Sequence, residues 1–259
     1  MELFDSHAHY NDEKFDEDRD NLIKEIYKYG VTKIINAGYS LEASKKALEI
    51  ASNYEFIFAT VGISPNDIDS FEEKDLNEIE KLSQNKKCLA IGEIGLDYHW
   101  NTDNKELQKH VFISQINIAN KLNLPIVIHT REAIFDTLEI LKNNPCINKG
   151  VFHCCPLNVD LVREGLKLGY YISFAGPCTF KNSKNANEII KMVPCDKMLI
   201  ETDSPYLSPE PLRGKRNDSR NLKYIVEKIA QVKELKPEEI AKITYNNAKT
   251  IFKQKNNAM

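Results

Sequence analysis

Eight short apolar runs alternate along the chain with segments that have helical periodicity. Each run has the length and the β-branched or aromatic content of a buried strand, and this alternation is typical of a parallel sheet covered by helices. Eight such units in a chain of 259 residues match the size of a TIM barrel, which takes about 250 residues. The runs lie at residues 2–5, 32–38, 56–63, 88–94, 125–129, 150–154, 170–175 and 197–202.

The segments between the runs carry helix signals. Leu22, Ile23, Ile26 and Tyr27 have the spacing of one apolar helix face, and Gly30 is placed to end that helix. Pro237 stands where the first position of a final helix is expected. Comparable spacing occurs at Leu107, Val111, Ala119 and Leu122, at Leu138 and Leu141, and at Leu222, Ile225, Val226 and Ile229.

These patterns predict one domain over residues 1–259, an α/β fold of the (β/α)8 TIM-barrel type in which some distortion is allowed. No repeat, low-complexity tract or Pro/Gly-rich linker interrupts the chain. The alternative is a doubly wound open sheet, which predicts a glycine-rich phosphate loop after the first strand. Residues 5–10 read DSHAHY instead, so the barrel is favoured.

Composition limits the classes of function. The chain is 42% hydrophobic and 28% charged with a net charge of −3, so it lacks the overall basic charge of many nucleic-acid-binding proteins. No apolar run is long enough to span a membrane, and the start shows no secretory signal. The six cysteines form no CxxC pair, which is typical of a reduced protein. We therefore expect a cytoplasmic location.

Four of the six histidines fall at the carboxyl ends of expected strands. They are His7 and His9 after the first strand, His129 after the fifth and His153 after the sixth. Two carboxylates share this placement: Glu93 on the fourth strand and Asp203 after the eighth. In a TIM barrel all these ends lie on the face where active sites are built.

A divalent metal site explains this set better than six separate structural roles. A lone histidine at a strand end is usually structural, and Asp203 before Ser204-Pro205 has the placement of a helix cap. Glu93, however, interrupts an apolar run, where an unpaired carboxylate is costly. Imidazole and carboxylate ligands together suit zinc, manganese, iron or nickel. Six ligands exceed one tetrahedral site, so two ions are expected. His99 and His110 are assigned structural roles.

Several motifs in this order resemble the TatD family of metal-dependent deoxyribonucleases, within the amidohydrolase superfamily. The resemblance extends from residue 3 to the terminal NNAKTIF. The motifs are DSHAHY, VGISPND, IGEIGLDYHW, LPIVIHTREA, GVFHCC and LIETDSPYLSPEPLRGKRN.

The resemblance implies a distorted TIM barrel with a two-metal centre that hydrolyses phosphodiester bonds of DNA. His7, His9 and Asp203 would hold one ion, His129 and His153 the other, and Glu93 would bridge them. Asp203 and Glu93 would be the catalytic carboxylates, with Asp203 as the general base. Arg131 would bind the substrate phosphate. The family is described as magnesium-dependent, which adds magnesium to zinc, manganese and iron as the expected divalent metal ions.

The sequence departs from the family at two places. Ser64-Pro65-Asn66 replaces a His-Pro-His that many members have, so this chain lacks two imidazoles expected beside the site. The strand-six motif continues as Cys154-Cys155-Pro156-Leu157 instead of Cys-Phe-Ser-Gly. Both departures concern substrate preference and leave the six metal ligands unchanged.

We therefore expect a hydrolase acting on ester bonds, a DNase whose substrate is DNA as single strands or ends. Two alternatives are a deacylase, amidase or lactonase using the same metal pair, and a non-catalytic metal-stabilised binding protein. A local basic patch would supply the DNA affinity that the net charge does not, and Tyr98, Trp100 and Tyr206 are candidate stacking platforms. The basic residues are Lys181, Lys184, Arg213, Lys215 and Arg216.

Overall fold

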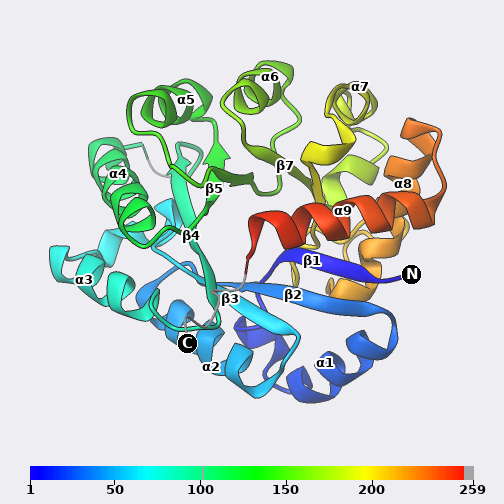
Figure 1. Cartoon of the computed structure of the whole chain (residues 1–259), viewed down its shortest axis with the longest axis horizontal. Helices are drawn as coiled ribbons and strands as arrows, with labels where there is room; N and C mark the ends of the chain where they lie inside the picture. The colour runs from blue at the N-terminus through cyan, green and yellow to red at the C-terminus, as the bar shows by residue number, and fades with distance from the viewer. Residues whose placement is uncertain (101, 254–259) are drawn as a thin grey trace. The chain divides into compact units, whose positions relative to one another are not determined.

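The computed structural model describes residues 1–100 and 102–253, and it contains the expected alternation of strands and helices (Figure 1). The strands are β1 (Leu3–Ala8), β2 (Val31–Ala37), β3 (Ile57–Val61), β4 (Cys88–Asp97), β5 (Ile126–Arg131), β6 (Gly150–Phe152), β7 (Tyr171–Phe174) and β8 (Met198–Ile200). The helices are α1 (Arg19–Lys28), α2 (Leu41–Asn53), α3 (Glu73–Leu82), α4 (Lys105–Lys121), α5 (Ile134–Asn143), α6 (Val159–Lys167), α7 (Ala186–Met192), α8 (Leu222–Lys233) and α9 (Pro237–Ile251).

The strands follow one another in a single sheet in the order β1-β2-β3-β4-β5-β6-β7-β8. The pairs β3/β4, β4/β5 and β7/β8 are parallel. Sequential parallel strands with intervening helices define the (β/α)8 class, which confirms the predicted fold. The prediction that residues 1–259 form a single domain stays a prediction.

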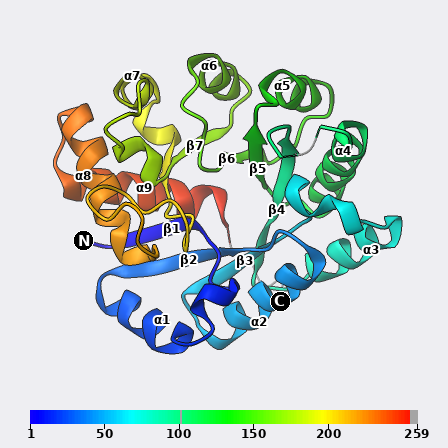
Figure 2. The same cartoon turned by 180° about the vertical axis from the view of Figure 1, so that it is seen from behind.

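The chain packs as two compact units. The first comprises residues 1–35 and 152–248, and the second comprises the described residues of 36–151 together with residues 249–253. In the second unit α4 packs against β4, beside the β3–β4–β5 sheet (Figure 1). In the first unit β1 lies beside the loop that leads from β8 to α8 (Figure 2), since the His9 N–H donates to the Ser204 carbonyl at 2.7 Å.

The strand boundaries differ from the expected ones in ways that affect the site. β1 continues to Ala8, so His7 lies inside the strand and not after it. β5 continues to Arg131, so His129 also lies within its strand. β8 ends at Ile200, and Asp203 is therefore three residues beyond it. Hydrogen bonding to a neighbouring strand sets these ends, and a single sequence does not reveal the pairing.

The elements form where local chemistry favours them. Gly30 ends α1 with a φ of +91°, and a Cβ there would approach the Met1 carbonyl oxygen to 2.5 Å. The Ser40 hydroxyl caps α2 by accepting from the Ala43 N–H at 3.1 Å. The assignment of Tyr27 and Leu107 to apolar helix faces is wrong, because 52% of the Tyr27 surface and 37% of the Leu107 surface are exposed.

The core is built on parallel strands that are buried along their length. All ten residues of β4 are buried, as expected for a strand covered on both faces. Large apolar side chains such as Phe112 and Phe152 are almost inaccessible to solvent. Among the described residues, no helix has both the length and the apolar character that a membrane span requires.

Candidate metal centre

Three histidines and an aspartate meet in the first unit. The Nε2 atoms of His7 and His9 are 3.1 Å apart, and Asp203 Oδ1 lies 3.6 Å and 3.2 Å from them. The His153 ring stacks on the His7 ring, with centroids 4.1 Å apart. His7, His153 and Asp203 offer ligand atoms that all lie within 4.8 Å of one another. Four of the sequence-predicted ligands are therefore brought together.

Backbone contacts hold β1 and the segment after β8 in this arrangement. The Asp203 N–H donates to the His7 carbonyl at 3.0 Å. Asp203 has a φ of +56°, a left-handed conformation that aspartate tolerates better than most residues. Because two backbone bonds fix the strand end, the carboxylate is directed at the imidazoles.

Asp5 also links β1 to the segment after β8. Its carboxylate accepts from the Thr202 N–H at 2.9 Å, the Thr202 hydroxyl at 2.6 Å and the Ser219 hydroxyl at 2.6 Å. Burial raises the pKa of Asp5 to about 7, although the bonds from Ser219 and Thr202 favour the ionised form. The sequence analysis did not single out Asp5, which lies two residues before His7 on the same side of the strand.

Asp203 stays ionised in this cluster. Burial alone would raise its pKa, but the hydrogen bond from His9 and the charges of the surrounding imidazoles outweigh burial and lower the pKa to about 2. Only 14% of its side chain is exposed. A buried carboxylate beside three imidazoles is a donor set that a divalent metal ion fits.

A second cluster lies within the second unit, on β4 and β5. His129 Nδ1 is 2.9 Å from Glu93 Oε1, and His129 Nε2 is 2.9 Å from Asp97 Oδ2. Gly95 sits opposite His129 in the β4/β5 register with a φ of +145°. A Cβ on Gly95 would lie 1.9 Å from the His129 carbonyl oxygen, so only glycine allows the two strands to approach here.

Asp97 is a functional candidate that the sequence analysis missed. It lies four residues after Glu93 on the same strand, and 1% of its side chain is exposed. Burial acts to raise its pKa, but the hydrogen bond from His129 and the His99 N–H lower it overall. If Glu93 and Nδ1 of His129 hold a metal, Nε2–H donates to Asp97, and this carboxylate fixes the tautomer and orientation of the ring.

Glu201 lies beside a ring nitrogen of His153, as Asp97 lies beside one of His129. It is fully buried, its Oε1 accepts from the Cys154 N–H at 2.5 Å, and Oε1 lies 3.4 Å from Nδ1 of His153. A carboxylate behind one nitrogen of a ligating imidazole is a recurrent feature of metal sites. The signal in the sequence was available, since Glu201 follows the apolar run Met198–Ile200 just as Glu93 interrupts one.

Other sequence-predicted site residues lie at the surface or in local structure. Arg131 is exposed, and its guanidinium lies 5.2 Å from the centroid of the Trp100 ring. Ser64 caps the short 3-10 helix η2 (Pro65–Ser70) by accepting from the Asn66 N–H at 3.1 Å. His99 and His110 pair with Glu132 and Glu73, which agrees with the structural roles assigned to them.

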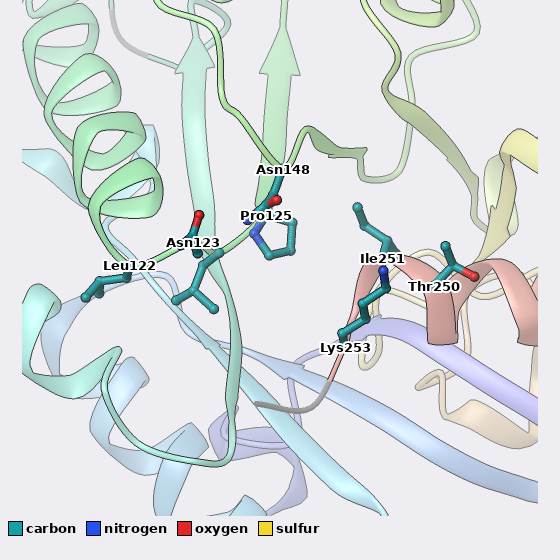
Figure 3. A pocket seen from close by; sticks show the side chains of 8 residues that line it. Leu122, Asn123, Pro125, Asn148, Thr250, Ile251 and Lys253 are labelled. Carbon is teal, nitrogen blue, oxygen red and sulfur yellow. The ribbon is translucent and has the colours of Figure 1, made fainter. Parts of the chain in front are cut away.

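A cavity of about 440 Å³ lies elsewhere in the second unit (Figure 3). Five of its lining residues precede β5 or β6, at the amino ends of those strands, and the other three lie at the end of α9 or after it, whereas His129 lies toward the carboxyl end of β5. In a barrel the amino-terminal face contributes stability and not chemistry. The lining residues are Leu122, Asn123, Leu124, Pro125, Asn148, Thr250, Ile251 and Lys253.

The fold and the histidine–carboxylate clusters define a metal-dependent hydrolase of the TIM-barrel class, and relatives carry that description. An uncharacterized metal-dependent hydrolase, YabD of Bacillus subtilis, is 44% identical over 252 residues, which is 97% of this chain and 99% of that protein. YcfH of Escherichia coli, also named an uncharacterized metal-dependent hydrolase, is 32% identical, covering 97% of this chain and 96% of that protein.

A match over almost the whole chain shows the family. The model of the family described as TatD related DNase matches residues 4–253, and the chain belongs to this family. The crystal structure of YJJV, a TatD homologue from Escherichia coli, has a TM-score of 0.91 at 25% identity, covering 96% of this chain and 97% of that one. A lactonase-derived organophosphate hydrolase with a TM-score of 0.70 and 12% identity shares the fold.

Proposed function

We propose that the chain is a DNase that hydrolyses phosphodiester bonds with the help of two divalent metal ions. The observation that carries the proposal is the pair of buried clusters in which His129 and His153 each have a carboxylate within 3.4 Å of one ring nitrogen. Because the carboxyl ends of the strands form one face in a (β/α)8 fold, we place both clusters in one site. Family membership supports DNA as the substrate.

In this site each residue has a defined role. His7, His9 and Asp203 would hold one ion, His129 and His153 would hold the other, and Glu93 would be shared between them. When bound, such ions lower the pKa of a water and stabilise negative charge on a phosphate. Asp97 and Glu201 orient the imidazoles of the second ion.

Asp203 accepts the proton of the attacking water. The hydrogen bond from His9 and the neighbouring imidazoles lower the pKa of Asp203, so its carboxylate is ionised and can accept a proton. Arg131 donates to the non-bridging phosphate oxygens, which its planar guanidinium can contact in pairs.

The test is a side-by-side assay of the metal-loaded protein. Single-stranded DNA, RNA of the same length, and panels of carboxylic esters, lactones and amides are the substrates. We expect hydrolysis of DNA, abolished by chelator and restored by a divalent metal ion. If the protein hydrolyses an ester, lactone or amide and leaves the DNA uncleaved, it is an acyl hydrolase and the alternative holds. Metal binding without any hydrolysis would show a non-catalytic binding protein.

A further inference from the structure

Trp100 is a large aromatic side chain left open to solvent beside the second cluster. It is the only tryptophan in the chain, and 70% of its surface is exposed. It lies three residues after Asp97, in the loop that leaves the carboxyl end of β4. The indole is not part of the buried core, so its face is accessible to a ligand.

The loop around Trp100 is fixed by bonds to β5 and α5. The Tyr98 N–H donates to the Arg131 carbonyl at 2.9 Å, and the Tyr98 hydroxyl donates to Asp136 at 2.7 Å. His99 Nδ1 lies 2.7 Å from Glu132, and the His99 ring packs edge-on against the indole with centroids 4.7 Å apart. The backbone that leads to Trp100 is therefore held in place before any ligand binds, and the His99 ring limits the freedom of the indole, which lowers the entropic cost of binding.

A positively charged side chain lies beside the indole. The Arg131 guanidinium lies 5.2 Å from the Trp100 ring centroid, and the described part of the chain offers it no carboxylate in an ion pair. Arg131 is two residues beyond His129 on β5, so the two side chains leave the strand on the same side. The charge of Arg131 is thus available to an anion that approaches the His129–Glu93 cluster.

A second exposed aromatic residue with an arginine over it lacks this property. Tyr29 is 65% exposed, and the Arg220 guanidinium lies 5.6 Å from its ring. Arg220, however, pairs with Asp218 at 2.8 Å and with Glu25 at 3.1 Å. Tyr29 also follows α1, next to the amino end of β2. The Arg220–Tyr29 pair is structural and gives a matched control.

We propose that Trp100 and Arg131 form a nucleotide-binding platform that selects single-stranded nucleic acid. A base stacks on the open indole while Arg131 binds the adjoining phosphate, which places that phosphate toward His129. A base is free to stack in this way only in a single strand, since in a duplex both of its faces are covered. The inference rests on the nuclease function proposed above and names its substrate form.

Trp100 itself reports the binding, because no other tryptophan contributes to the fluorescence. The Asp203→Asn variant is titrated with a mixed-sequence single-stranded DNA oligonucleotide, with its duplex, and with an abasic strand of equal length. We expect quenching by the single strand and little by the duplex or the abasic strand. Equal quenching by the abasic strand, or binding of the single strand seen by anisotropy without quenching, would overturn the platform.

Variants separate the two contacts. Trp100→Ala should weaken binding of the labelled single strand about 5- to 150-fold, the range of one base–aromatic stack, and should leave binding of the abasic strand unaffected. Arg131→Gln should weaken both. Tyr29→Ala should change neither. Metal content of each variant serves as the check on folding, and equal losses for Tyr29→Ala and Trp100→Ala would reject a specific platform.

The failure of this inference is distinguishable from the failure of the nuclease proposal. If the wild-type protein hydrolyses DNA but Trp100 is not quenched, the platform is wrong and the nuclease stands. If Trp100 is quenched by single strands but no phosphodiester is hydrolysed, the binding site stands and the nuclease proposal is wrong.

Discussion

The Glu201 carboxylate lies 3.4 Å from Nδ1 of His153 and is fully buried. Its Oε2 has no hydrogen-bond partner among the described residues. Burying a carboxylate in this way is costly. A metal on the other nitrogen of His153 would polarise the imidazole, and its Nδ1–H would then donate to Oε1 of Glu201.

Glu201→Gln should weaken metal binding about 10- to 100-fold, the usual effect of losing an orienting carboxylate. The variant keeps the shape of the side chain but removes its charge. Competition with a fluorescent chelator measures the affinity. Glu164→Gln, a carboxylate that pairs with Lys167 on α6, is the control and should bind metal normally. An unchanged affinity for Glu201→Gln would mean that Glu201 does not support the metal.

Metal analysis after reconstitution should find about two divalent ions per chain. His7→Ala should weaken binding of one ion and His153→Ala binding of the other, whereas Glu93→Ala should weaken both because we propose that Glu93 is shared by the two ions. Elemental analysis combined with calorimetric titration resolves the two affinities. A stoichiometry of zero would reject the metal centre, and equal effects of all three variants on a single ion would reject the assignment of ligands.

Asp203→Asn should lower turnover on DNA by at least about a hundredfold, the low end for losing a general base. The amide keeps the size of the side chain and cannot accept the proton. Binding of single-stranded DNA, measured by anisotropy, should survive. Asp160→Asn, at an exposed pair with Arg163, is the matched control. Turnover close to that of the wild type would exclude Asp203 as the base.

The basic residues after β8 have different roles, which a sequence pattern does not distinguish. Arg216 binds both oxygens of Asp18, at 2.9 and 2.5 Å, and the Lys14 carbonyl at 2.7 Å. Arg213 is exposed and lies 4.3 Å from the Phe180 ring centroid. Arg213→Gln should therefore weaken DNA binding and reduce its salt dependence by about 0.7 in the logarithmic slope. Arg216→Gln should leave both unchanged.

Arg216→Gln should instead alter acid stability. The Arg216 guanidinium lowers the pKa of Asp18, so the pair stabilises the fold above the ordinary pKa of Asp18. This contribution disappears as the pH falls through the lowered value. Because the pair is partly exposed, the difference is below about 1 kcal/mol. Thermal unfolding from pH 7 to pH 2 should show a smaller loss for the variant than for the wild type.

The sequence was sufficient for the fold class and for the candidate ligands because both depend on local patterns. Apolar runs mark strands, and His153 stands out because it directly follows one. The partner of each residue depends on long-range pairing, which one sequence does not contain. Asp18 and Arg216 are 198 positions apart, and nothing near either residue predicts the pair. Asp97 and Glu201 were missed although each shares a strand face or a strand end with a chosen ligand.

Asn66→His tests the departure from the His-Pro-His of the family. The Ser64 hydroxyl caps η2 by accepting from the Asn66 N–H, so Ser64→His would lose this cap at a cost of about 1 kcal/mol. Asn66 has an exposed side chain and can be replaced without that loss.

If an imidazole on the carboxyl side of β3 shuttles a proton, Asn66→His should raise DNase turnover. It should also add a limb to the pH–rate profile between about pH 6 and 7.5, around the pKa of histidine. Metal content should not change. A pH–rate profile and a turnover equal to those of the parent would show that the imidazole has no role at this position, and a rise in bound metal would show that position 66 lies within reach of the ions.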